Sequence, residues 1–393
     1  MKRKITAIIS LMVLSILGTL YFLKGGAVLA IEAKEQKKAL NISSKAAYVC
    51  DYDTQTVIYA RNENARLPIA SMVKIMTLIL CYEHLDSGAM AMDDVITASE
   101  NAASMGGSQA FLEAHGQYKI EDLIKSIVMS SANDSCVAMA EHICGSVEGF
   151  VQKMNQKAKE LNLQNTNFVN CTGLPAENSY SSAKDVSIMM AELIKHKEYF
   201  LHSRIWMDKI IHKGGRETEL TNTNKLSRFY EGCDGGKTGY TTEALHCLCA
   251  TAKRNNLRLI SAVIGAPDSK TRFAEVSKLF NYGFANYENK ILVSSQNPLE
   301  QGIEVIRGKK KILQIKPEQD IAIFKARTDE LKSIEVKQEN YTVKAPVKEG
   351  DIVGKITLVY DGQPYKSVNI IACENIDRKG YKDNIKDMFK HWH

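Results

Sequence analysis

Ser71 and Lys74 are the first residues of this sequence whose types and spacing suggest chemistry. They stand three residues apart in the apolar run LPIASMVKIMT (67–77), so a helix there would carry both side chains on one face. Burial lowers the pKa of a lysine, and a neutral amine could then take the proton of a neighbouring serine hydroxyl. Alternatively, Ser71 only caps the helix and Lys74 extends into solvent, and this motif alone does not decide between the two.

A polar segment at residues 130–135 is the second candidate, because it interrupts a stretch (120–144) with the apolar pattern of helices. Within it, Ser131 and Asn133 could pass a proton and hold a substrate amide. An ordinary turn between two helices would explain the same residues.

The third candidate is the segment Gly235-Gly236-Lys237-Thr238-Gly239. Its glycines would let an edge strand approach a ligand backbone closely, while Lys237 and Thr238 offer an ammonium and a hydroxyl to a carboxylate. A phosphate-binding loop is excluded, because the spacing and the following helix are missing. A glycine-rich hairpin with a solvated lysine remains the plain alternative.

The elements that must position these segments follow from the surrounding patterns. Residues 46–60 predict two strands around a turn, and residues 70–83 predict a helix. Two β-rich runs, 244–254 and 257–265, are joined by two asparagines, which favours a hairpin. Residues 268–287 predict a further helix.

Composition changes near residues 294–298, which we interpret as a linker. The short alternating segments beyond it, as far as residue 372, predict a small β domain.

Residues 1–30 have the pattern of an export signal. Three basic residues at 2–4 precede a 19-residue apolar run (5–23), and small residues allow cleavage after Ala30. The run is also long enough for an uncleaved membrane anchor. Either interpretation places the rest of the chain outside the cytoplasm.

The C-terminal tail predicts an amphipathic helix that lies on an anionic membrane surface. Basic residues outnumber acidic ones there, and the apolar residues share one helical face: Tyr381, Ile385, Met388, Phe389 and Trp392. A terminal helix that docks on its own protein is the alternative.

Charge and cysteine content exclude other classes of protein. Beyond Ala30 the chain has 47 basic and 45 acidic residues, which gives no argument for a nucleic-acid partner. The nine cysteines do not form a disulfide framework. Cys247 and Cys249 would share a strand face, but only His246 is adjacent, so we expect buried thiols and no metal or cofactor. Cys136 and Cys233 lie near the motifs, which suggests an activity sensitive to oxidation.

Taken in order, Ser-x-x-Lys at 71, Ser-x-Asn at 131 and Lys-Thr-Gly at 237 form the motif set of penicillin-recognising serine acyl enzymes. The sequence strongly resembles the low-molecular-mass penicillin-binding proteins that are serine-type D-alanyl-D-alanine carboxypeptidases, above all the Gram-positive, spore-former members. The resemblance spans about residues 42–380 and extends to residues 67–71, 106–108, 170–175, 272–284 and 345–354. One departure is Ala132, where many relatives have glycine.

The resemblance implies the catalytic roles. Ser71 would attack the carbonyl between two terminal D-alanines of a peptidoglycan stem peptide, and Lys74 would accept its proton. Ser131 would pass a proton to the leaving D-alanine, and Asn133 would hold the substrate amide.

The same resemblance implies the substrate contacts. Lys237 and Thr238 would bind the terminal carboxylate, with Arg272 as a second contact, and Gly239 would let the strand approach the substrate. The N–H of Ser71 and one from the strand after Lys237 would form the oxyanion hole. β-Lactam antibiotics would be trapped at Ser71 because they imitate the same dipeptide.

The implied organisation has five parts. An α/β (α+β) catalytic domain with an antiparallel sheet and helices (42–293) follows a signal peptide (1–30) and a linker (31–41). A small all-β domain (294–373) and an amphipathic membrane-anchor helix (374–393) come after it. We expect an exported enzyme at the outer face of the cytoplasmic membrane or the cell wall, in part secreted, and with no nucleic-acid partner.

Two alternatives remain at this point. A class A β-lactamase shares the three motifs but needs a glutamate for fast deacylation, and residues 170–187 hold no convincing counterpart. The second β domain and the anchor are also foreign to a small soluble β-lactamase. The other alternative is a catalytically silent penicillin-binding or wall-binding module.

Overall fold

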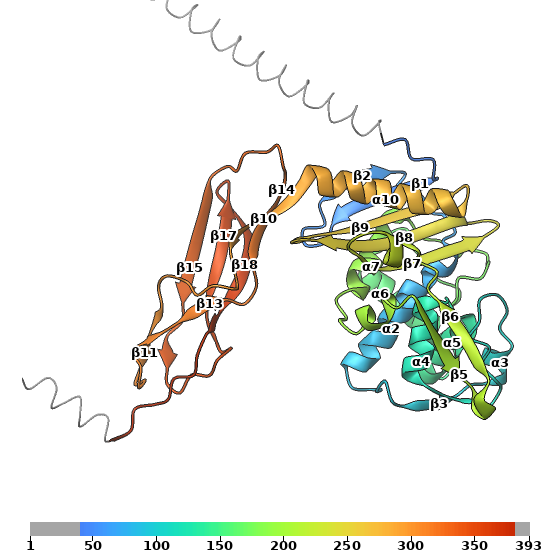
Figure 1. Cartoon of the computed structure of the whole chain (residues 1–393), viewed down its shortest axis with the longest axis horizontal. Coiled ribbons are helices and arrows are strands. Elements are labelled where there is room, and N and C mark those ends of the chain that lie inside the picture. The colour runs from blue at the N-terminus through green and yellow to red at the C-terminus, as the bar shows by residue number, and fades with distance from the viewer. Residues whose placement is uncertain (1–39, 382–393) are drawn as a thin grey trace, which may run out of the picture. The chain divides into compact units, whose positions relative to one another are not determined.

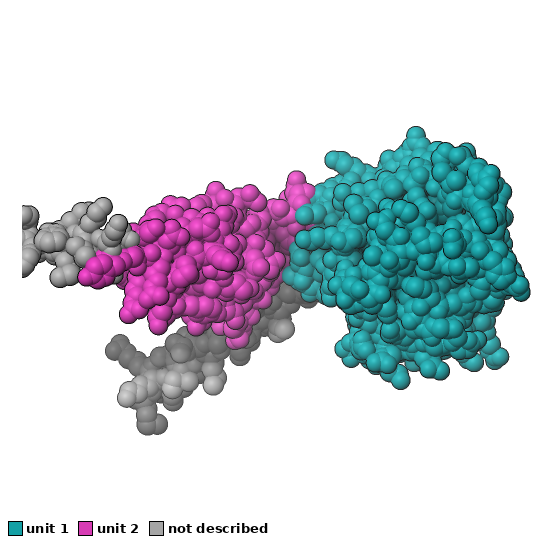
Figure 2. All heavy atoms as spheres, turned by 90° about the horizontal axis from the view of Figure 1, so that it is seen from below, with its two compact units in different colours: residues 1–254, 258–283 teal, residues 255–257, 284–393 magenta. Residues whose placement is uncertain are grey.

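The computed structural model describes residues 40–381, which form two compact units. The first unit contains the residues up to Arg254 together with Arg258–Gly283, and the second contains Asn255–Leu257 and the chain from Phe284 onward (Figure 2).

The first unit is built on a five-stranded sheet with the order β2-β1-β9-β8-β7. Its strands are β1 (Ala46–Asp51), β2 (Val57–Arg61), β7 (Cys233–Thr241), β8 (Leu245–Arg254) and β9 (Leu257–Ala266). β1 pairs antiparallel with β2 and β9, and β7 pairs antiparallel with β8. Because β7 is an edge strand, its outer side is available to a ligand backbone.

Helices lie on both faces of this sheet. One face is covered by α10 (Ser269–Asn286), whereas α2 (Lys74–Asp86), α6 (Val147–Glu160) and α7 (Ala183–Leu193) lie on the opposite side (Figure 1). The remaining helices are η1 (Ala70–Val73), α3 (Glu100–Ala103), α4 (Ile120–Met129), α5 (Asn133–Cys144), α8 (Tyr199–Ser203), η2 (Lys213–Gly215) and α9 (Leu226–Phe229). Two hairpins complete the unit: β3 (Val95–Thr97) with β4 (Gln117–Lys119), and β5 (Met207–Ile211) with β6 (Glu217–Thr221).

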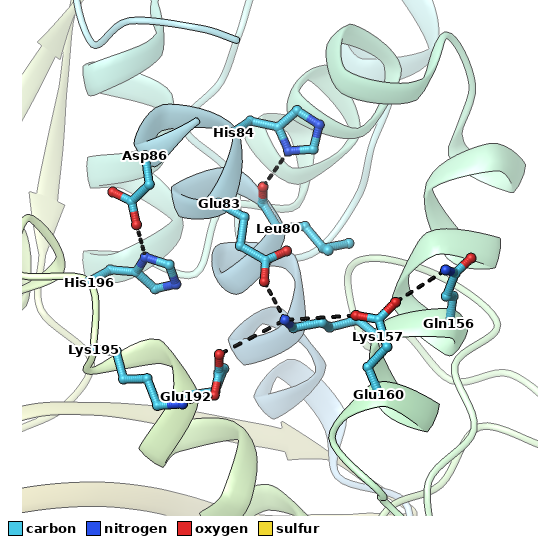
Figure 3. Close-up of polar contacts among 10 residues, drawn as sticks. All are labelled: Leu80, Glu83, His84, Asp86, Gln156, Lys157, Glu160, Glu192, Lys195 and His196. Atoms are coloured by element: carbon cyan, nitrogen blue, oxygen red, sulfur yellow. Dashed lines mark hydrogen bonds and ion pairs between the residues drawn. The ribbon is translucent and has the colours of Figure 1, made fainter. Parts of the chain in front are cut away.

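Helix α2 is the central element of the core. Every residue from Lys74 to Tyr82 is buried, as expected for a helix that is apolar on all sides. Near its other end, Lys157 of α6 forms ion pairs with Glu83 of α2, with Glu192 of α7 at 3.9 Å and with Glu160 at 3.9 Å (Figure 3). These ion pairs connect α6 to α2 and to α7. They fix α2 at the end opposite Lys74.

The second unit is an all-β domain, as predicted. It contains a β10–β14 pair, a three-stranded sheet β12-β11-β16 and a four-stranded sheet β13-β18-β17-β15, around a core of aliphatic residues. The strands are β10 (Tyr287–Val293), β11 (Ile303–Ile306), β12 (Ile312–Leu313), β13 (Ile315–Pro317), β14 (Ile321–Ala326), β15 (Ile334–Asn340), β16 (Val343–Lys344), β17 (Ile352–Tyr360) and β18 (Gln363–Ala372).

Two boundaries differ from those expected. The second unit begins at Phe284 rather than at 294, because β10 pairs with β14 of that unit. Residues 374–380, which we expected to open the tail helix, are not helical, and Ile376 pairs with Val347 in the β-domain core. The predicted signal peptide, residues 31–39 of the linker and residues 382–393 of the tail lie outside the described residues.

Candidate active site

Ser71 and Lys74 lie at the junction of η1 and α2. Ser71 belongs to the 3-10 turn, and Lys74 is the first residue of the α-helix, so the single helix expected from residue 70 begins with a tighter turn. The Nζ of Lys74 lies 3.0 Å from the Oγ of Ser71. Ser71 is half-buried whereas Lys74 is fully buried, so a substrate can reach the hydroxyl while water is kept from the amine.

The surroundings of Lys74 suit a neutral amine. Its Nζ lies 2.7 Å from Asn133 Oδ1 and 2.6 Å from the carbonyl oxygen of Thr172. Burial lowers the pKa of Lys74. A neutral amine has two N–H groups, which these two acceptors satisfy, and its lone pair is then left for the hydroxyl of Ser71. The arrangement can therefore act as a general base toward Ser71.

The Ser131–Asn133 segment forms the junction between α4 and α5. Asn133 begins α5, and its Nδ2 donates to the carbonyl of Gly106 at 2.7 Å while its Oδ1 faces Lys74. Ser131 has a left-handed backbone (φ 65°), and its side chain is buried. Its Oγ has no hydrogen-bond partner within residues 40–381, so this hydroxyl can serve an incoming group.

Strand β7 supplies the third motif from the edge of the sheet. Lys237 is buried, and burial together with the charge of Lys74 holds its pKa well below the usual range. Gly239 permits a close approach to the nucleophile: a Cβ there would lie 2.5 Å from the carbonyl of Ile69 and 3.3 Å from the nitrogen of Ser71. The strand therefore runs beside Ser71, with Lys237 two residues away along it.

Arg272 contacts the backbones of β7 and of the neighbouring strand β8. From α10 it donates to the carbonyl of Gly239 at 3.0 Å and to that of Cys247 at 3.3 Å. It supports β7 at its glycine, and the contact with the substrate carboxylate that the resemblance implied stays a prediction.

Two residues near the site were not singled out from the sequence. The carbonyl of Thr172 contacts Lys74, and the hydroxyl of Thr223 lies 2.9 Å from the hydroxyl of Thr238. Thr172 lies within residues 170–175, which are part of the resemblance, but the resemblance assigned no role to it. Nothing in the sequence around Thr223, which follows strand β6, indicates that it meets β7.

The cysteines near the motifs are protected by burial. Burial raises the pKa of Cys136 to about 11 and that of Cys233 to about 12, so both are thiols rather than reactive thiolates near neutral pH. This argues against an activity that is sensitive to oxidation at these positions. Within residues 40–381, no group of three His, Cys, Asp or Glu side chains is arranged to hold a metal ion.

Comparisons with known proteins identify the family of this chain. Residues 32–268 match the family model described as D-alanyl-D-alanine carboxypeptidase, and residues 287–378 match the C-terminal domain of penicillin-binding protein 5. The chain therefore belongs to the D-alanyl-D-alanine carboxypeptidase family.

Individual relatives cover nearly the whole chain. D-alanyl-D-alanine carboxypeptidase DacF of Bacillus subtilis is 40% identical over 351 residues, which is 89% of this chain and 90% of the relative. D-alanyl-D-alanine carboxypeptidase DacA of Escherichia coli is 30% identical over 89% of both chains. The crystal structure of penicillin-binding protein 5 from Haemophilus influenzae is similar with a TM-score of 0.65 and 29% identity, over 86% of this chain and 98% of that one.

Proposed function

We propose that this protein is a serine-type D-alanyl-D-alanine carboxypeptidase that removes the terminal D-alanine from peptidoglycan stem peptides through an acyl-enzyme at Ser71. The observation that supports this most directly is the buried amine of Lys74, 3.0 Å from Ser71 Oγ and between two hydrogen-bond acceptors. Membership of the family gives independent support.

In the acylation step, Ser71 Oγ attacks the carbonyl carbon between the two D-alanines, and Lys74 takes the hydroxyl proton. The negative charge on the carbonyl oxygen is stabilised by the backbone N–H of Ser71 and by one from β7 after Lys237. Lys237 and Thr238 hold the terminal carboxylate. Because β7 is an edge strand, the substrate backbone can lie along its outer side.

Collapse of the tetrahedral intermediate breaks the C–N bond. Ser131, whose Oγ is buried with no partner within residues 40–381, gives a proton to the nitrogen of the leaving D-alanine and is reprotonated at the expense of Lys74, which becomes neutral again. Asn133 holds the amide of the substrate while its own Oδ1 stays close to Lys74. Water then attacks the ester carbonyl and releases Ser71 together with the shortened peptide.

A fluorescent penicillin and a peptide ending in D-Ala-D-Ala test this function with the purified protein. We expect a stable label on the wild type, free D-alanine from the peptide, and neither with Ser71→Ala. Rapid turnover of the penicillin would point to a β-lactamase instead. The absence of labelling in a folded wild type would point to a catalytically silent module.

We also propose that the enzyme acts outside the cytoplasm, in contact with the membrane through its C-terminal segment. The basic and apolar pattern at residues 1–30 and the amphipathic pattern from Tyr381 onward support this. Within the described part of the chain, no helix is both long and apolar enough to cross a membrane. Co-sedimentation with anionic vesicles tests the proposal: the full chain should bind, and a chain ending at Gly380 should not. Equal binding of the two would contradict the role of the tail.

A further inference from the structure

A cavity of about 710 Å³ lies in the first unit, outside the candidate active site. It is formed between helix α7 and the hairpin of β1 and β2, where β2 is the edge strand opposite β7. None of the residues that line it belongs to the three motifs. Its volume falls within the range of about 300–1,000 Å³ that is usual for ligand sites, so the cavity can hold a ligand of its own.

Helix α7 connects this cavity to the neighbourhood of the nucleophile. Ser181, just before α7, and Leu67, four residues before Ser71, exchange backbone hydrogen bonds of 2.9 and 3.0 Å. Beyond the other end of α7, the Nδ1 of His196 lies 2.5 Å from a carboxylate oxygen of Asp86, the last residue of α2. Because the nucleophile lies just before α2, the cavity extends along α7 from near the site toward the far end of α2.

The ionic side chains in the cavity lining balance one another. Lys184 and Lys195 carry positive charges, and Asp53 and Glu192 carry negative ones. Lys195 and Glu192 form an ion pair in which the Nζ lies 2.5 Å from a carboxylate oxygen. A strongly anionic or cationic ligand would meet attraction and repulsion together in such a lining, so the charges favour a ligand that is polar but uncharged.

Two tyrosine hydroxyls provide hydrogen-bonding groups in the same cavity. Tyr48 is only 4% exposed, yet its hydroxyl has no hydrogen-bond partner within residues 40–381. The hydroxyl of Tyr52, which also lines the cavity, has none in the described part of the chain either. Burial raises the pKa of both tyrosines, so both stay protonated and can each donate and accept a hydrogen bond. A ligand with hydroxyl or amide groups would satisfy them.

Apolar surface completes the lining. Val57 of β2 is 47% exposed, and Ile188 and Ala191 of α7 line the cavity as well. A pyranose ring has an apolar face of C–H groups and hydroxyls at its rim, so it can pack on aliphatic and aromatic side chains while its hydroxyls bond to the tyrosines. The lining therefore fits an uncharged carbohydrate.

We propose that this cavity is a secondary binding site for the N-acetylated sugar chain of the polymer that carries the stem peptides. The identity of this polymer rests on the proposed function. Tyr48 and Tyr52 bond to hydroxyl and amide groups of the sugars, and the apolar side chains pack against the rings. Because the stem peptide is covalently joined to the sugar chain, binding the chain raises the local concentration of the peptide at Ser71. The site therefore favours peptides on the polymer over free peptides.

An uncharged oligosaccharide tests the site without any turnover. The probe is N-acetylchitotetraose, and calorimetric titration measures its binding. The wild type should bind it, and Tyr48→Phe/Tyr52→Phe, which loses both hydroxyls and keeps both rings, should bind about tenfold more weakly. Tyr341→Phe is the matched control, because it removes a hydroxyl from an exposed tyrosine of the second unit and should bind like the wild type. Thermal unfolding of each variant checks that the fold is retained.

Release of D-alanine from two substrates connects the site to activity. The substrates are uncrosslinked peptidoglycan strands with stems that end in D-Ala-D-Ala, and a free diacetyl-lysyl-D-Ala-D-Ala peptide. The double variant should lower kcat/KM for the strands about tenfold and leave kcat/KM for the free peptide unchanged, because the free peptide carries no sugar. Saturating N-acetylchitotetraose should have the same selective effect on the wild type.

Each outcome has a separate meaning. Failure of the oligosaccharide to bind the wild type, or equal binding by the folded double variant, overturns the sugar site. Equal losses for the strands and the free peptide, or no loss for either, overturn it as well. If the oligosaccharide binds and the double variant loses this binding, but neither substrate releases D-alanine, the sugar site stands and the proposed function is contradicted.

Discussion

Replacing Ser131 by alanine should make the protein more stable while removing most of its carboxypeptidase activity. The side chain of Ser131 is 4% exposed, and its Oγ has no hydrogen-bond partner within residues 40–381. A buried hydroxyl without a partner costs about 1–3 kcal/mol of folding free energy. Alanine removes that hydroxyl and keeps the Cβ, so any strain at φ 65° is the same in both proteins.

The expected gain is about 1 kcal/mol, at the low end of that range because a small void replaces the oxygen. For a unit of this size, 1 kcal/mol raises Tm by about 2–4 °C. The rate of D-alanine release should fall by roughly 10²–10⁴, the usual contribution of a positioned proton donor. Stability and activity therefore move in opposite directions.

Ser135→Ala is the matched control, because Ser135 lies four residues further along the chain, in α5, and is also buried. Its Oγ accepts a hydrogen bond from Ser126 Oγ at 2.7 Å, so its removal should destabilise the protein by about 1 kcal/mol. Calorimetry and a coupled D-alanine assay give both quantities for each variant. A loss of stability for Ser131→Ala as large as that for Ser135→Ala would refute the reasoning, since it would mean that the hydroxyl of Ser131 is already paired.

Three further predictions concern other residues of the candidate site. Thr223→Val should raise KM for the peptide about three- to tenfold by removing the partner of Thr238, and Thr223→Ser should restore it. Gly239→Ala should lower Tm and slow penicillin labelling, because the new Cβ would lie 2.5 Å from the carbonyl of Ile69; an unchanged labelling rate would contradict this close approach. Since only neutral Lys74 can accept a proton and burial lowers its pKa, labelling should slow as pH falls through that lowered pKa. A labelling rate that increases toward acid pH would exclude Lys74 as the base.

The sequence predicted the three motifs and their elements because each motif is short and local. The strand pair at 46–60, the helix that contains Lys74 and the polar break at 130–135 all depend on neighbouring residues, and the structure confirms them. The β-rich second unit was also recognisable, since its strands alternate apolar and polar residues.

Contacts between distant segments could not be predicted in the same way. The carbonyl of Thr172 reaches Lys74 across 98 residues, and any residue type could supply that carbonyl. The pairing of β10 with β14 moved the domain boundary, because a strand that follows a helix directly gives no local signal of the sheet to which it belongs. Ile376 lies within the predicted tail segment but packs in the β-domain core, because its partner strand residue Val347 is distant in sequence and gives no local signal.

The two buried lysines of the site serve different steps, and burial affects both. Burial lowers the pKa of both Lys74 and Lys237, and the charge on Lys74 lowers the pKa of Lys237 further. The site therefore disfavours two ammonium groups at once. A substrate carboxylate at Lys237 favours the charged form of that lysine, because an opposite charge nearby raises its pKa. The carboxylate and the charged Lys237 together add no net charge beside Lys74, so the neutral form of Lys74, which accepts the proton of Ser71, is kept by burial. A peptide that lacks the terminal carboxylate would therefore lose its contact with Lys237 while Lys74 stays able to act as the base, so KM should rise more than kcat falls.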